Sequence, residues 1–298
     1  FGKENFKESI KEEWFVQLDT NVSMNPQFVY NHFTKEKMII VQNDDYKVFA
    51  IPAESPNHGP HIIVNSPWDL SASPFGWHDT NGASGPEFTI TRGNNVHAYQ
   101  DSNNSGSSSG DEPDGGPTLD FNFPYTYPAA PAVNQDASVT NLFYGNNVIH
   151  DIAYLFGFRE VNGNFQVNNY GNGGVGNDDV RAEAMDGGGL NNANMFTPAE
   201  GSRPRMQMYL WSTASPYLDG DFDNGIVFHE YAHGISNRLT GGPSTAGCLG
   251  NTEQMGEGWS DYFGLILTME AGDTGLDGRG IGTFALDQST NGPGIRPA

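Results

Sequence analysis

The residues with the clearest chemical signature are His229-Glu230-Tyr231-Ala232-His233, in which two histidines four positions apart flank a glutamate. On a helix, residues four apart are separated by about 6 Å along the axis and lie on one face, so both imidazoles can reach one metal ion. The glutamate is then turned toward the open side of the ion, where it can take a proton from an attacking water. The pattern predicts a metal-dependent hydrolytic site.

A third ligand is predicted at Glu257, which lies 24 residues beyond His233 at the start of another predicted helix. Two imidazoles and one carboxylate leave a fourth tetrahedral position for water, as in catalytic rather than structural zinc sites. Asp261, four residues later, is expected to accept a hydrogen bond from a ligand histidine, His229, and so to fix its tautomer. The alternative is an amphipathic helix with two exposed carboxylates, which would not explain their position one short loop after the histidine pair.

Two helices must position these side chains. The first is predicted from about residue 226 to residue 239, with Asp223 and Asn224 as N-cap candidates and the sequence 240–243 (TGGP) as its end. The second is predicted from about 255 to 269. One side of this second helix carries Trp259, Phe263, Ile266 and Leu267.

The remainder of the chain divides by composition. All six lysines lie within the first 47 residues, so residues 1–45 are interpreted as a separate N-terminal segment, either the tail of a prosegment or an extension of the domain. Residues 46–225 are rich in Gly, Asn, Pro and Ser, which predicts a strand- and loop-rich subdomain with one helix at 141–158. Residues 226–298 form the helical, zinc-binding part. The predicted fold class is therefore α+β.

The net charge of −22 narrows the classes of partner. It comes from 36 acidic and 14 basic side chains, which argues against a nucleic-acid surface, because binding phosphates needs clustered Lys and Arg. No segment approaches the roughly 20 apolar residues that span a bilayer. The polar loop 101–116 offers calcium the oxygen atoms of Asp101, Asn103, Asp111 and Asp114. Because their spacing fits no EF-hand, a solvated loop is the preferred interpretation.

The sequence HEYAHGISNRLTGGP at 229–243, followed by MGEGWSDYFGL at 255–265, resembles the fungalysin family of secreted zinc metallopeptidases. Further stretches that resemble this family are 66–68, 73–78, 91–96 and 141–158. The similarity covers about residues 46–298. It implies a thermolysin-like fold, endopeptidase action on protein substrates, secretion, and an inhibitory prosegment. On this view, residues 1–45 resemble the junction between the prosegment and the mature enzyme.

The resemblance also implies roles for individual residues. The zinc ligands of the family carry over onto His229, His233 and Glu257, and its general base carries over onto Glu230. Thermolysin-like enzymes bind the substrate backbone with an edge-strand stretch that Asn191, Asn192 and Ala193 resemble. A peptide would there add to the sheet as a further strand. An ordinary Gly/Asn-rich turn is the alternative for these three residues.

One departure concerns the stabilisation of the oxyanion. Thermolysin-like enzymes use later side chains for it, including a His, but no His follows His233 and no Tyr occurs in 240–254. Since only about 70 residues follow the start of the zinc helix, we expect an incomplete catalytic domain or a second chain that supplies the rest.

Two other functions remain open. A secreted binding or adhesion module with a structural or degenerate zinc site is one, although a structural site would not require Glu230. An exopeptidase is the other, with the same metal site and recognition of a substrate terminus.

Overall fold

The computed structural model describes residues 27–30, 37–40, 47–50, 62–253, 255–269 and 278–297. The chain forms two compact units, residues 1–45 and 46–298. In the first unit, strand β1 (Gln27–Tyr30) pairs antiparallel with β2 (Lys37–Ile40). The interpretation of residues 1–45 as a prosegment tail lies largely outside the described residues.

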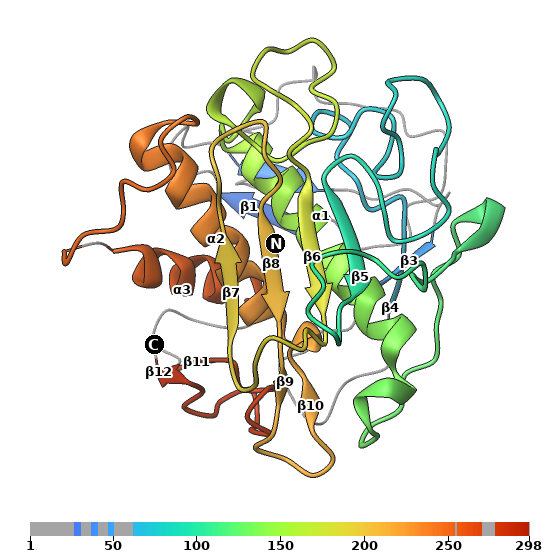
Figure 1. Cartoon of the computed structure of the whole chain (residues 1–298), viewed down its shortest axis with the longest axis vertical. Coiled ribbons are helices and arrows are strands. Elements are labelled where there is room, and N and C mark those ends of the chain that lie inside the picture. Colours follow the sequence, from blue (N-terminus) through green and yellow to red (C-terminus); the bar gives the residue numbers. More distant parts are fainter. Residues whose placement is uncertain are drawn as a thin grey trace, which may run out of the picture. The chain divides into compact units, whose positions relative to one another are not determined.

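The second unit is organised around a four-stranded sheet with the order β5-β6-β8-β7 (Figure 1). The strands β5 (Val96–Gln100), β6 (Val180–Ala184) and β8 (Arg205–Met208) are parallel, and β7 (Ala193–Phe196) pairs antiparallel with β8. Within the described residues, β8 is the only strand beside β7 in this sheet. The sheet therefore has an edge strand next to the predicted substrate-binding stretch.

Alternation along the strands gives the sheet one apolar and one polar face, because successive side chains of a strand point to opposite faces. The buried apolar face consists of Val96, Ala98, Val180, Ala182, Ala184, Ala193, Met195, Met206 and Met208. Helix α1 (Gln135–Leu155) contacts β5 and β6, and helix α2 (Asn224–Gly241) contacts β7 and β8. Both helices belong to the same apolar core, which fixes α2 beside the strand edge.

Helix α1 begins six residues earlier than the predicted 141–158 and ends three residues earlier. The start of the helix could not be predicted from the spacing of apolar residues, because the residues buried there include the small polar side chains of Ser138 and Thr140. Gly157, with φ of +105°, follows the end of the helix in the left-handed region that favours glycine.

The two helices predicted to carry the metal ligands are both present. α2 spans Asn224–Gly241, and the carboxylate of Asp223 accepts a hydrogen bond from the Ile226 N–H at 3.3 Å, as expected of an N-cap. Helix α3 spans Gly256–Leu267. These bounds confirm the predicted positions to within two residues at each end.

Helix α3 approaches α2 through small residues, not through its apolar side. Gly256, Ser260 and Gly264 are its buried positions, and a Cβ added at Gly264 would lie 2.7 Å from the carbonyl oxygen of Gly225. Exposed large apolar side chains, at helical spacing along and beside the helix, are Met255, Trp259, Tyr262, Ile266 and Met269. Trp259 and Ile266, which the sequence places on one side of the helix, are thus exposed.

The other strands form short antiparallel pairs, as the Gly- and Asn-rich composition predicted. They are β3 (Lys47–Ala50) with β4 (Ile62–Asn65), β9 (Leu210–Trp211) with β10 (Leu218–Asp219), and β11 (Gly280–Ile281) with β12 (Arg296–Pro297). Short 3₁₀ helices occupy Gly116–Thr118, Pro131–Val133, Glu160–Asn162 and Gly220–Phe222. The architecture is mixed α and β.

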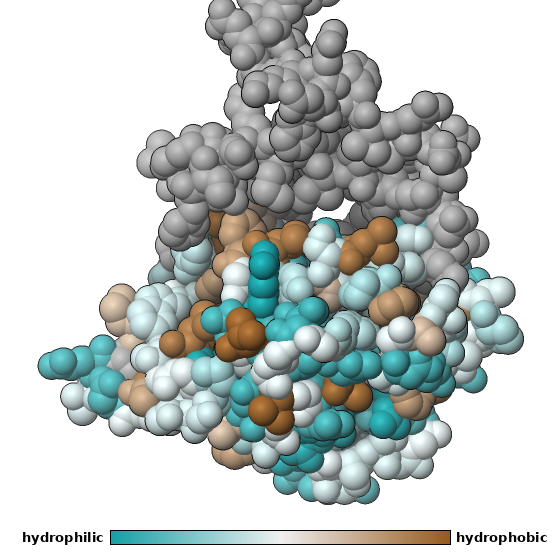
Figure 2. Space-filling model, turned by 90° about the horizontal axis from the view of Figure 1, so that it is seen from above, coloured by the Kyte–Doolittle hydropathy of each residue, from teal (hydrophilic) through white to brown (hydrophobic). Residues whose placement is uncertain are grey.

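Polar and apolar residues both contribute to the described surface. On the face in Figure 2, apolar residues form separate patches between polar ones. None of the described helices has the length and apolar character needed to cross a membrane.

Candidate metal centre

The three predicted ligands meet between α2 and α3. The Nε2 atoms of His229 and His233 are 3.0 Å apart, and the Glu257 carboxylate lies 3.2 Å from the first and 3.5 Å from the second. One ligand atom from each side chain falls within 4.8 Å of the other two. Two imidazole nitrogens and a carboxylate oxygen are usual zinc ligands at about 2.0–2.2 Å, so this set, called the metal site below, fits one divalent ion.

Asp261 lies behind the metal site, as its spacing predicted. Its Oδ1 is 2.7 Å from Nδ1 of His229. Burial opposes ionisation of Asp261, but contacts with His229 and Arg296 outweigh it and lower the pKa of this carboxyl to about 2. An ionised Asp261 holds the proton of His229 on Nδ1, which leaves Nε2 free to bind a metal.

Glu230 points into the same site without a partner. Its side chain is buried, and no described side chain hydrogen-bonds to its carboxylate. Burial raises the pKa of Glu230 to about 7; the charge of Glu257 acts in the same direction and that of His229 opposes it. A carboxylate with a pKa near neutrality is suited to accept a proton and return it.

A cavity of about 690 Å³ opens onto the metal site. It runs between the β7 edge, the two helices and the segment 281–296. The residues that line it are Asn191, Asn192, Ala193, Asn194, Met195, Trp211, Ile226, His229, Glu230, His233, Asn237, Glu257, Ile281, Leu286, Gly294, Ile295 and Arg296. The cavity therefore joins the catalytic candidates to an unpaired strand edge.

The stretch Asn191-Asn192-Ala193 forms part of one cavity wall. Asn191 has φ of +56° and accepts a hydrogen bond from the Ser212 N–H at 2.8 Å, so it belongs to a turn. Ala193 is the first residue of the edge strand β7. The stretch is both a turn and the beginning of an edge strand, and its role in binding substrate stays a prediction.

Arg296 is a site residue that the sequence did not reveal. Its guanidinium donates hydrogen bonds to both oxygens of Asp261, at 2.9 and 2.8 Å, and to Glu257 at 3.2 Å. It reaches the site because β12 pairs with β11, with Ile281 opposite Arg296. No local motif announces that pairing, so only the fold could identify it.

A second group of potential metal ligands lies on the polar face of the sheet. Asp101, Glu183 and Asp186 are buried and also within 4.8 Å of one another; they are called the carboxylate cluster below. The Arg205 guanidinium contacts all three carboxylates. Of the residues considered for calcium, Asp101 belongs to this cluster.

The loop 101–116 is not simply solvated. Asp101 is 2% exposed, and its carboxylate accepts hydrogen bonds from the N–H groups of Ser105 and Gly106, both at 2.7 Å. The interpretation as a merely solvated loop is wrong at this residue, because its carboxylate organises a turn that folds the loop onto the sheet.

A histidine pair on one helix, a carboxylate from the next and a cleft beside an edge strand define a site of the metallopeptidase class. A family model described as fungalysin metallopeptidase (M36) matches residues 45–298. The chain therefore belongs to the fungalysin family.

Known relatives agree with this membership. The chain is 45% identical over 289 residues to extracellular metalloproteinase mep of Aspergillus flavus, which covers 94% of this chain and 45% of the relative. It is 44% identical to extracellular metalloproteinase 2 of Trichophyton tonsurans, and the match covers 88% of this chain and 42% of the relative. It is 39% identical to extracellular metalloproteinase MEP of Fusarium vanettenii, and the match covers 97% of this chain and 46% of the relative. The chain thus spans less than half the length of these relatives.

Proposed function

We propose that this chain is the catalytic part of a secreted, zinc-dependent endopeptidase. His229, His233 and Glu257 hold the metal, and Glu230 is the general base. The observation that carries the proposal is the convergence of three ligand atoms within 4.8 Å beside a buried carboxylate that no described side chain engages, at the wall of an open cavity. Secretion is supported by the extracellular relatives.

The ligand types favour zinc in this site. Imidazole nitrogens suit zinc, whereas calcium prefers oxygen ligands alone. A bound zinc ion supplies a Lewis acid that polarises the scissile carbonyl and lowers the pKa of a water molecule. Calcium stays a prediction for the carboxylate cluster, where Arg205 already provides a positive charge.

Three side chains around the metal site have separate proposed roles in catalysis. Glu230 accepts a proton from the attacking water and transfers it to the leaving nitrogen. Asp261 fixes the orientation of His229. Arg296, held by Asp261 at the cavity wall, can donate a hydrogen bond to a substrate carbonyl oxygen.

Substrate binding is assigned to the β7 edge. An extended peptide along Asn192 and Ala193 would pair with an unpaired backbone edge, so main-chain hydrogen bonds would supply affinity with little demand on sequence. The cavity reaches past the metal site in the direction of Asn237 and of Ile281, which gives room on both sides of a scissile bond. This arrangement supports internal cleavage over removal of a terminal residue.

The fold is proposed to be thermolysin-like, with a larger helical subdomain than the described residues contain. Two observations support this proposal. The exposed apolar residues of the α3 region, including Trp259, Tyr262 and Ile266, lie at helical spacing, as a face that packs against further helices would. The relatives are more than twice as long as the matched region. Oxyanion donors in addition to Arg296 are assigned to that subdomain, since the described cavity lining contains no Tyr and no His beyond the two ligands.

Residues 1–45 are proposed to be the end of an inhibitory prosegment. The family match begins at residue 45, and the compact second unit begins at residue 46. All lysines except Lys47 lie before this boundary, which sets the segment apart in composition.

Proteolysis of a terminally blocked peptide tests the function. We expect cleavage at internal bonds that a chelator abolishes and added zinc restores, with the products mapped by mass spectrometry. The assay should be run on this chain and on a form extended to the length of the relatives. Chelator-insensitive cleavage, or zinc binding without cleavage by the extended form, would contradict the proposal and favour a binding module.

A further inference from the structure

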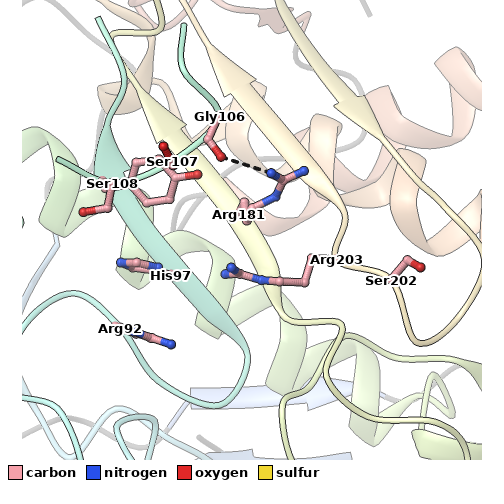
Figure 3. A pocket seen from close by; sticks show the side chains of 9 residues that line it. Arg92, His97, Gly106, Ser107, Ser108, Arg181, Ser202 and Arg203 are labelled. Atoms are coloured by element: carbon pink, nitrogen blue, oxygen red, sulfur yellow. Dashed lines mark hydrogen bonds between the residues drawn. The ribbon is translucent and has the colours of Figure 1, made fainter. Parts of the chain in front are cut away.

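A second cavity, of about 500 Å³, lies on the polar face of the sheet (Figure 3). Its walls include the side chains of Arg92, Arg181 and Arg203, and we call it the arginine pocket. Serine hydroxyls of the loop 101–116, at Ser107 and Ser108, form another part of the wall. The pocket is thus lined by hydrogen-bond donors of positive charge.

The concentration of arginine is unusual for this chain. The whole sequence contains 8 arginines and has a net charge of −22. Only one of the three arginines of the pocket is neutralised by a carboxylate: Nη2 of Arg203 lies 2.7 Å from Asp179. Within the described part of the chain, Arg92 and Arg181 have no ion-pair partner; Arg92 instead lies 4.3 Å from the centroid of the Phe88 ring. The pocket therefore contains two guanidinium groups without a direct ion pair to a described carboxylate, while Glu112 and Asp179 lie nearby.

Arg181 gives the strongest indication of an absent partner. Its Nη1 donates one hydrogen bond to the carbonyl oxygen of Gly106, at 3.1 Å. Its Nε is buried and has no hydrogen-bond partner among the residues that the structure describes. Figure 3 shows this side chain extending along the sheet toward Gly106, with the guanidinium of Arg203 directed toward His97. A buried N–H donor without an acceptor is costly, so Arg181 is not held at this position by a full set of hydrogen bonds, and the part of its guanidinium that lines the pocket can donate to an anion there.

The position of the pocket separates it from peptide cleavage. It lies over β5 and β6, whereas the substrate cleft borders β7 at the opposite edge of the sheet. Three strand spacings of about 4.8 Å separate the two edges. A ligand in the pocket would therefore not occupy the path of a peptide along β7.

We propose that the arginine pocket binds a tetrahedral oxyanion, the phosphate or sulfate group of a small molecule. Guanidinium groups from β6 (Arg181) and from the segments before β5 (Arg92) and before β8 (Arg203), together with serine hydroxyls, can donate hydrogen bonds to the three or more acceptor oxygens of such a group. The cavity exceeds the volume of the bare ion, which leaves room for an attached organic group. The inference is independent of the proposed peptidase activity.

Calorimetric titration of the zinc-loaded chain tests the proposal. The probes are inorganic phosphate, inorganic sulfate and a sugar monophosphate, with chloride at matched ionic strength as the reference. We expect saturable binding of the oxyanions and none of chloride. Tighter binding of the sugar phosphate identifies an ester as the ligand, and equal binding identifies the free ion; both support an oxyanion site. Heats no larger than those of chloride would overturn it.

Variants locate the binding. We expect Arg181→Gln and Arg92→Gln each to weaken phosphate binding about ten-fold or more, as expected for loss of a charge-assisted hydrogen bond. The matched control is Arg159→Gln, because Arg159 is exposed and does not line the pocket. Phosphate can also reach a zinc ion, so the titration is repeated on zinc-depleted protein. Unchanged affinity in folded Arg181→Gln and Arg92→Gln proteins, with or without zinc, would refute the pocket as the site.

Discussion

The metal site and the carboxylate cluster each bring three potential ligand atoms close together, but the two groups differ in chemistry. Each places three potential ligand atoms within 4.8 Å. In the cluster all three side chains are buried carboxylates, and the Arg205 guanidinium contacts each of them. The metal site combines two imidazoles with one carboxylate, opens onto a cavity and adjoins Glu230, the proposed base, whose carboxylate has no hydrogen bond to a described side chain. Proximity of potential ligand atoms is therefore insufficient to identify a zinc site. The two sites are distinguished by the type of ligand and by whether an arginine already supplies the positive charge.

The largest expected effect is the loss of zinc when one imidazole is removed. His233→Ala should leave too few ligands and bring both zinc content and peptidase activity to background. The matched change in the carboxylate cluster, Glu183→Gln, should leave zinc at one equivalent. Elemental analysis of both purified proteins checks this contrast. Zinc lost from the Glu183 variant and kept by the His233 variant would reverse the assignment of the two sites.

Glu230→Gln should separate metal binding from catalysis. The amide cannot accept the proton of the attacking water, so turnover should fall by about 10²- to 10⁴-fold while zinc content stays normal. Rates on a blocked peptide, measured beside elemental analysis, provide the test. A variant with full zinc and unchanged turnover would remove Glu230 from the mechanism.

Removing Arg205 should destabilise the fold without touching the metal site. Arg205→Met leaves three buried carboxylates without their cation, and we expect the free energy of unfolding to fall by about 3 kcal/mol. Denaturant unfolding of wild type and variant measures the change. Calcium should stabilise the variant more than the wild type, because it can replace the lost charge. Equal stability of the two proteins would show that Arg205 does not balance the cluster.

Asp261→Asn should weaken zinc binding by about 10- to 100-fold, the usual effect of losing a carboxylate behind a ligand histidine. A competitive chelator titration measures the affinity. Asp287→Asn is a suitable control, since Asp287 bonds to Tyr127 and not to the metal site. An unchanged zinc affinity in Asp261→Asn would leave that carboxylate with a purely structural role.

A dependence of stability on pH is expected from the carboxylate cluster. Burial, with a hydrogen bond to Asp186, raises the pKa of Glu183 from 4.5 to about 7. The folded state therefore binds the Glu183 proton more tightly than the unfolded state does. The contribution of this proton to the free energy of unfolding is fully present below pH 4.5 and is lost as the pH rises through about 7. Wild type should lose unfolding free energy relative to Glu183→Gln between pH 5 and pH 8. Parallel pH profiles of the two proteins would contradict the raised pKa.

The sequence could predict the features that depend on local spacing. His229 and His233 share a face because they are four apart on a helix, and the N-cap at Asp223 and the glycines after the helix set its limits. The proximity of Asp261 to His229 followed from the position of Glu257 at the start of the next helix. These relations extend over short stretches of chain, so residue type and periodicity were enough to predict them.

Features that depend on distant pairing could not be predicted. Arg296 reaches Asp261 only through the pairing of β12 with β11. Asp101 and Glu183 meet because β5 and β6 are parallel neighbours. The contact of α3 with α2 through small residues such as Gly264 also depends on close packing of two helices, which apolar periodicity does not reveal.

Anomalous diffraction at the zinc absorption edge tests the central claim most directly. The account predicts a single strong peak about 2.0–2.2 Å from Nε2 of His229, Nε2 of His233 and a carboxylate oxygen of Glu257. A peak at the carboxylate cluster, or a fourth protein ligand that closes the site between α2 and α3, would contradict it.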